Sequence, residues 1–149
     1  MYQRIEFAFA VLLLALIVVL VGVAAAARVV GAPIIWSIEI AQLLFAWLAM
    51  VAADLALQQD RHIGMSLLLD LLPPSLRHYA EVLNILILVA LVGFLGVYAL
   101  INTALMHPRL IGATQMNASL VHASMAVGLL LMLRTLLVHL YRSVRKLAE

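Results

Sequence analysis

Four long apolar runs dominate the amino-acid sequence and constrain its fold more than any other feature. A helix that crosses the hydrocarbon core of a bilayer, ~30 Å thick, needs about 20 apolar residues. Phe7–Ala27, Val82–Met106 and Leu110–Leu133 contain no charged residue, and Val29–Ala53 contains only Glu39. These runs predict an all-α membrane protein with four transmembrane helices, at about residues 7–28, 34–57, 80–106 and 112–140.

The composition excludes an ordinary soluble domain. Hydrophobic residues make up 67% of the chain and charged residues 11%, whereas a typical globular domain has about 25% charged residues. The chain has no cysteine, which excludes a disulfide scaffold, a thiolate metal site and a cysteine nucleophile. The nine lysines and arginines flank the apolar runs and form no continuous stripe, so we expect no nucleic-acid partner.

The lysines and arginines are distributed unevenly between the predicted loops. With the N-terminus inside the cell, Arg28 and Arg109 lie outside and the other seven of the nine lie inside. Cytoplasmic loops carry such an excess, so both termini are expected in the cytoplasm. The first run is longer than the ~7–15 apolar residues of a signal-peptide core and is expected to remain as a helix. The chain is then a single integral membrane domain over residues 1–149.

The segment between the second and third predicted helices is too apolar for a free loop and too short to span a bilayer. His62, Ser66 and Asp70 recur every fourth residue, and Pro73–Pro74 would end a helix. The pattern predicts a short interfacial helix at about residues 63–72, with Arg61 facing membrane phospholipid headgroups. Two interpretations stay open, a surface-lying connector and a docking helix for another membrane subunit.

The second predicted helix has two contrasting faces. Small or polar residues recur every three or four positions along one face, and bulky residues line the neighbouring face. Small faces let helix backbones approach closely in lipid. We therefore expect the small face to pack against protein and the bulky face to see lipid or a groove. The small face comprises Glu39, Gln42, Ala46, Ala49, Ala53 and Ala56, and the bulky face Trp36, Ile40, Leu43, Trp47, Met50 and Asp54.

Glu39 is the only charged residue in the apolar run Val29–Ala53, and we expect it close to the outer interface. A charge at mid-bilayer costs about 3 kcal/mol or more, so such residues usually have a role. Three roles are open: a proton or cation site, a salt bridge between helices, and an interfacial anchor. Arg28 and Arg109 are the candidate partners for a salt bridge.

The histidines do not form a cofactor site by sequence. His122 and His139 lie in the last predicted helix, about 25 Å apart by the helical rise, and cannot ligate one haem iron. No metalloprotease, hydrolase or phosphate-loop motif is present. We therefore expect no enzyme activity, no cofactor and no metal, and we interpret the histidines as hydrogen-bonding groups at headgroups or between helices. Gln115, Ser119 and His122 are expected to share a polar face at the start of the last helix.

A set of motifs in fixed order resembles a known family. The motifs are Trp36–Glu39, Phe45–Leu48, Arg61–Ile63, Leu71–Pro73 and Arg77. Together with the length and the four spans, they resemble the small permease subunit (DctQ-like) of tripartite ATP-independent periplasmic (TRAP) transporters.

The resemblance implies a non-catalytic scaffold in the bacterial inner membrane. It implies two partners: a large multi-spanning permease subunit, and a periplasmic substrate-binding protein that supplies organic acids for sodium-coupled import. It also implies docking of the binding protein near Arg28, Arg109 and Gln115. The residues expected at the large-subunit interface, or in structural contacts, are Trp36, Glu39, Gln42, Ala46, Ala49, Ala53, Arg61, His62 and Asp70.

Two other functions remain as alternatives at this point. One is a membrane anchor subunit of a respiratory enzyme, which would hold a quinone or a haem. The other is a small four-helix exporter in which Glu39 couples transport to protons. Loss of all transport on a Glu39→Gln change would favour the exporter over the scaffold.

Overall fold

A computed structural model describes residues 2–58 and 74–148 and shows four long helices and one small hairpin. All four helices are long and apolar enough to cross a membrane, which confirms the predicted all-α class. The predicted interfacial helix at residues 63–72 lies outside the described residues. The helices are α1 (Tyr2–Val29), α2 (Ser37–Gln58), α4 (Pro74–Leu105) and α5 (Ser119–Ala148), and the strands are β1 (Leu110–Ile111) and β2 (Met116–Asn117).

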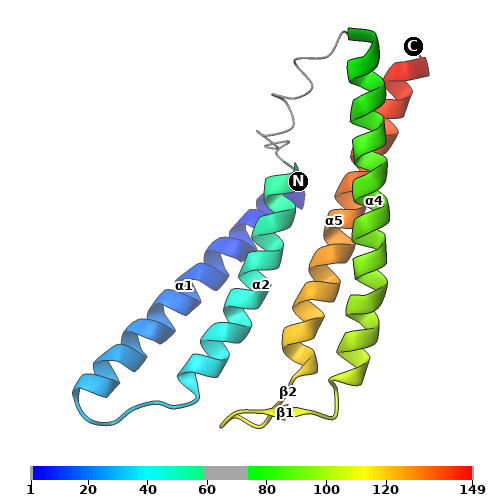
Figure 1. The fold of residues 1–149 in the computed structure, drawn as a ribbon. Helices are drawn as coiled ribbons and strands as arrows, with labels where there is room; N and C mark the ends of the chain where they lie inside the picture. Colours follow the sequence, from blue (N-terminus) through cyan, green and yellow to red (C-terminus); the bar gives the residue numbers. More distant parts are fainter. Residues whose placement is uncertain (1, 59–73, 149) are drawn as a thin grey trace.

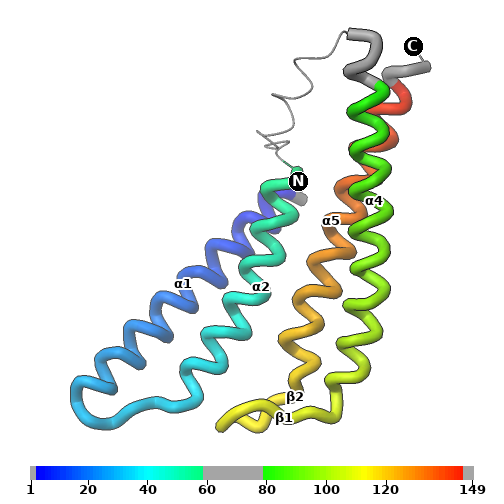
Figure 2. Tube along the Cα trace, viewed as in Figure 1, coloured from blue at the N-terminus to red at the C-terminus, as the bar shows by residue number. Residues whose placement is uncertain are grey.

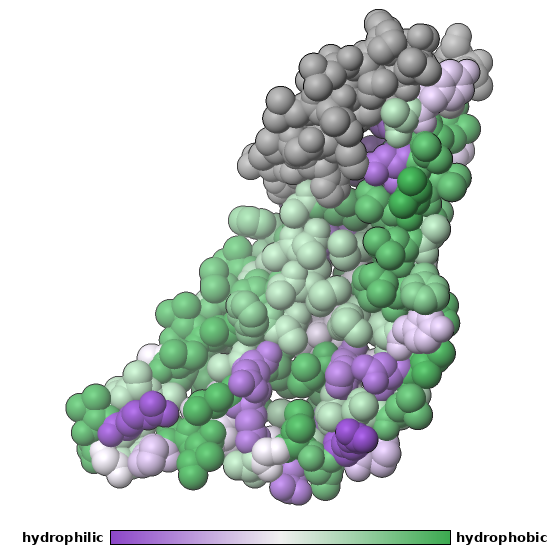
Figure 3. Space-filling model, viewed as in Figure 1, coloured by the Kyte–Doolittle hydropathy of each residue, from purple (hydrophilic) through white to green (hydrophobic). Residues whose placement is uncertain are grey.

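The four helices form a row rather than a closed bundle. Helix α2 packs against both α1 and α5, and α4 packs against α5, so α1 and α4 lie at the two edges (Figure 1). Only 11% of the α1 span and 33% of the α5 span is buried inside the chain. The row therefore exposes wide apolar surfaces, visible as the green area over the helices in Figure 3.

The two ends of the row differ in their connections. The start of α1 and the end of α5 lie at one end, and the α1–α2 loop and the hairpin lie at the other (Figure 2). Both ends of the chain are thus on one side of the row, as four spans require. The predicted cytoplasmic location of that side stays a prediction. We call it the inner end and the opposite side the outer end.

The last helix begins at Ser119, later than the predicted start near residue 112. Directly before this start, strands β1 and β2 form an antiparallel hairpin that pairs Leu110 with Asn117 and Ile111 with Met116. Gly112 and Gln115 have positive φ angles of 64° and 52°, a conformation that a helix does not contain. Gln115 therefore lies in the hairpin turn, and the predicted polar face shared by Gln115, Ser119 and His122 on one helix is wrong.

A hydrogen-bonded turn leads into α2. The hydroxyl of Ser37, a buried residue, donates a hydrogen bond of 2.6 Å to the carbonyl of Ile34. This contact satisfies a hydroxyl that would otherwise be buried without a partner. Pro33 precedes this turn, and the helix begins slightly later than the predicted residue 34.

The core lies between α2, α4 and α5. Met50 of α2 packs directly on Gly128 of α5, where an added Cβ would lie 2.5 Å from the Met50 Cβ. Met50 and Asp54 of the bulky face thus pack inside the chain, whereas Ala49 and Ala56 of the small face are exposed. Met50 and Asp54 were expected to face lipid or a groove, and this expectation is wrong for these two residues, because the small residue that permits the close approach of Met50 lies on α5. The buried cluster comprises Leu57, Val92, Ala99, Ala126, Leu129 and Leu136.

Candidate functional site

A buried carboxylate lies at the inner end of the row. Asp54 of α2 is 1% exposed and accepts a hydrogen bond of 2.8 Å from the Thr135 hydroxyl on α5. A second bond of 2.7 Å comes from the Gln58 side-chain amide, one turn further along α2. A buried carboxylate without donors would cost several kcal/mol. The two donors make Asp54 a stable link between α2 and α5.

The Gln58 amide extends this link to α1. Its nitrogen Nε2 also donates a 2.5 Å hydrogen bond to Oε2 of Glu6, so its two hydrogens join two carboxylates. The other oxygen of Glu6 accepts a bond of 3.2 Å from the Arg134 guanidinium on α5. We call Glu6, Asp54, Gln58, Arg134 and Thr135 the inner polar network. It connects three helices at one level.

This network was not predicted from the sequence. Asp54 was placed on the bulky face with no role assigned, and neither Glu6 nor Thr135 was singled out. The local signal was the Asp54–Gln58 spacing of one helical turn, which brings an acceptor and a donor together. The other members are distant in sequence and meet only in the folded chain.

A second polar contact lies at the outer end and centres on Glu39. Its carboxylate accepts hydrogen bonds from the backbone amides of Ala113 at 2.5 Å and Thr114 at 2.9 Å. The Thr114 hydroxyl donates a third bond, of 2.5 Å. Gly112 lies so close that an added Cβ would overlap the Glu39 carboxylate. Glu39 therefore connects α2 to the tip of the hairpin that joins α4 and α5.

These donors differ from the expected salt-bridge partners of Glu39. The donors to its carboxylate are neutral groups of the hairpin, two backbone amides and the Thr114 hydroxyl, and not Arg28 or Arg109. Backbone amides at a tight turn can satisfy a carboxylate without a second charge. The geometry supports the structural role for Glu39 over a proton or cation site.

A third polar contact joins α4 and α5. The Asn102 side-chain amide lies 3.2 Å from Nδ1 of His122, at hydrogen-bond distance. The sequence analysis expected the histidines in such interhelical bonds, and His122 has one. Within residues 2–58 and 74–148, no three histidine, aspartate or glutamate side chains lie close enough to share a metal ion. Every buried side-chain nitrogen or oxygen described there has a hydrogen-bond partner.

The residues predicted to contact a partner are spread along α2 and the outer end. Trp36 is 49% exposed, Gln42 and Ala49 are exposed, and Ala46 and Ala53 are half-buried. Arg28, Arg109 and Gln115 are exposed at the outer end, where polar residues gather in Figure 3. Arg61, His62 and Asp70 lie outside the described residues.

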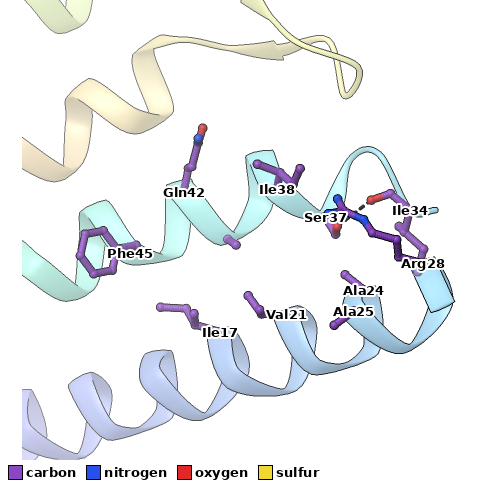
Figure 4. Close-up of a pocket in the computed structure, with 11 residues that line it drawn as sticks. Ile17, Val21, Ala24, Ala25, Arg28, Ile34, Ser37, Ile38, Gln42 and Phe45 are labelled. Carbon is purple, nitrogen blue, oxygen red and sulfur yellow. Dashed lines mark hydrogen bonds between the residues drawn. The ribbon is translucent and has the colours of Figure 1, made fainter.

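A groove separates α1 from α2 near the outer end (Figure 4). Its volume is about 410 Å³, and it is lined mainly by apolar side chains, with Arg28 and Ser37 at one end and Gln42 further along α2. It is an open site on the surface of the row.

Four membrane-spanning helices joined by interhelical polar contacts define a multi-pass membrane protein. The family model of the DctQ component of tripartite ATP-independent periplasmic transporters matches residues 16–146. The chain therefore belongs to this family and is a small permease subunit of a TRAP transporter, which confirms the resemblance seen in the motifs. A search of curated proteins finds no match to the chain.

Proposed function

We propose that this subunit is a fixed scaffold that binds a large multi-spanning permease subunit in the bacterial inner membrane. The transporter that they form would import organic acids with sodium, supplied by a periplasmic substrate-binding protein. The observation that best supports this proposal is the open row of helices, in which α2 occupies an interior position and still has an exposed face.

The exposed face of α2 supports large-subunit binding. Ala49 and Ala56 are exposed although α2 has neighbours on two sides, and Gln42 continues the same face. Small side chains let a second helix approach closely in lipid, and a polar side chain adds an interhelical hydrogen bond. Ala46 and Ala53 lie between these positions. We assign this face to the large subunit, with Trp36 at its outer limit. It comprises Gln42, Ala46, Ala49, Ala53 and Ala56.

The outer end supports docking of the binding protein. Arg109 and Gln115 lie on or next to the hairpin, and the Glu39 contacts hold the tip of that hairpin in place. A preorganised loop loses less conformational entropy on binding than a free one. We assign Arg28, Arg109 and Gln115 to this contact. Arg61, His62 and Asp70 are assigned, from the family resemblance alone, to the large-subunit interface or to structural contacts at the inner membrane surface.

Affinity purification tests the scaffold role. The tagged chain would be purified from detergent-solubilised native membranes, and we expect a many-span membrane subunit to accompany it near one-to-one. Recovery of the chain alone, or with a soluble redox enzyme, would contradict the proposal.

Photocrosslinking then tests the assigned face. A photoreactive residue placed at Ala49 is expected to crosslink to the large subunit. The same residue at Val19 of α1, which is 63% exposed and apolar, is the matched control. Equal crosslinking from both positions would show that α2 contributes no specific interface.

A further inference from the structure

The groove between α1 and α2 combines a long apolar wall with a single cation at one end. Ile17, Val21 and Ala24 of α1 face Ile38, Ala41 and Phe45 of α2 across it. Figure 4 shows Ile17 and Val21 directed toward α2, with Arg28 at the end where the helices are connected.

The length of the groove matches one leaflet of a bilayer. The lining residues of α1 extend from Ile17 to Arg28, which is roughly 16 Å at the helical rise. Half of the hydrocarbon core is about 15 Å thick. The apolar wall therefore covers the depth of one acyl chain, and Arg28 lies at the level of the headgroups.

The polar end of the groove lacks an anion. Arg28 lies in the last turn of α1 and is exposed, and within the described part of the chain its guanidinium has no recorded ion-pair or hydrogen-bond partner. The nearby carboxylate of Glu39 is bound to the hairpin instead. Ser37 lies beside Arg28, where its hydroxyl donates to the Ile34 carbonyl, and Gln42 lines the groove further along α2.

We propose that this groove is a binding site for an anionic phospholipid of the outer leaflet. One acyl chain lies between α1 and α2, and the phosphate binds Arg28. Guanidinium groups bind phosphate oxygens by paired, charge-assisted hydrogen bonds. A phospholipid supplies an apolar chain and an anion at the required spacing in a single molecule.

Native mass spectrometry of the full-length chain, with any subunit that accompanies it, tests the site. Phosphatidylglycerol and phosphatidylcholine with identical acyl chains would be titrated into delipidated protein. We expect tighter binding of phosphatidylglycerol, by about tenfold, because its headgroup has a net negative charge for Arg28, whereas the choline cation of phosphatidylcholine offsets the charge of its phosphate. Arg28→Ala should abolish the preference and Arg28→Lys should keep part of it. Arg109→Ala, at the same end but outside the groove, should leave it unchanged.

A variant with a larger side chain in the groove tests the apolar wall separately from Arg28. Val21 is 50% exposed and lines the groove, whereas Val23 is 54% exposed and does not. Val21→Trp should weaken binding of both lipids, and Val23→Trp should not. Ala25→Leu, also in the lining, is a smaller variant for use if Val21→Trp does not fold.

Three results would overturn the proposal. The first is an unchanged phosphatidylglycerol preference in Arg28→Ala. The second is equal lipid binding by the Val21 and Val23 variants. The third is crosslinking of a photoreactive residue at Val21 to a protein helix instead of lipid, which would assign the groove to a partner subunit.

Discussion

Met50 on α2 and Gly128 on α5 are in direct contact, with no space for a side chain at position 128. This contact sets the distance between the two interior helices of the row. It lies between the inner polar network and the Glu39 contact, so α2 and α5 are joined along most of their shared length.

Gly128→Ala is expected to destabilise the protein. The new Cβ would lie 2.5 Å from both Cβ and Cε of Met50, and Cβ cannot move without the helix backbone. Overpacking of this kind costs about 1–3 kcal/mol. We expect a lower apparent melting temperature in detergent, followed by tryptophan fluorescence.

Gly93→Ala is the matched control for this change. An added Cβ at Gly93 meets no atom within 4 Å outside its own helix, and alanine is favoured over glycine in a helix by about 0.5–1 kcal/mol. Stability should stay equal or rise. Equal destabilisation by both variants would show that the Met50 contact is not the cause.

Thr135→Val should destabilise the inner polar network. Valine has nearly the shape of threonine but cannot donate to the buried Asp54 carboxylate. A buried acceptor that loses a donor costs about 1–3 kcal/mol. The free energy of unfolding, from denaturant titration in mixed micelles, is the measurement.

Thr103→Val supplies the comparison for Thr135. The Thr103 hydroxyl donates to the Ala99 carbonyl of its own helix, which already lies in a helical hydrogen-bond pattern. We expect a change well below that of Thr135→Val. Similar losses would mean that the Asp54 contact adds no specific stability.

Glu39→Ala should release the hairpin tip while leaving the helices intact. The amides of Ala113 and Thr114 lose their acceptor, so their hydrogen exchange should become faster. Gln42→Ala, one turn along α2 and exposed, is the control and should leave exchange at both amides unchanged. Unaltered exchange in Glu39→Ala would show that the carboxylate does not hold the turn.

Glu39→Gln tests the role of the charge in transport. Glutamine keeps an acceptor oxygen for the Thr114 donors, so a structural residue should tolerate the change with partial loss. We expect reduced but measurable uptake by the complete transporter in proteoliposomes. Complete loss of uptake at normal expression would favour a coupling carboxylate.

The helices were predictable because charges are absent over long runs, and a bilayer permits no other local structure for such runs. The hairpin was not predictable from hydropathy. Leu110, Ile111 and Met116 look like helix residues, but Gly112 and Gln115 adopt positive φ angles, and the Glu39 contact favours the turn. The contact that favours the turn over the start of a helix comes from Glu39, which lies on α2 and is distant in sequence.

The polar contacts were predictable in type but not in partner. Glu39 was recognised as a residue with a role, since a charge in a span is costly. Its neutral donors could not be identified, because backbone amides are present at every position of a sequence. Asp54 and Met50 were assigned to a face toward lipid or a groove, because the matching Thr135 and Gly128 lie on a distant segment.

The α2–α5 contact is the main joint between the two helical pairs, α1–α2 and α4–α5. Asp54 secures it near one end of α2, and Glu39 near the other. A single attachment would allow the pairs to swivel about it, whereas two attachments far apart resist both swivelling and sliding. The large subunit would therefore contact a scaffold in which the two helical pairs keep their relative position at both membrane surfaces.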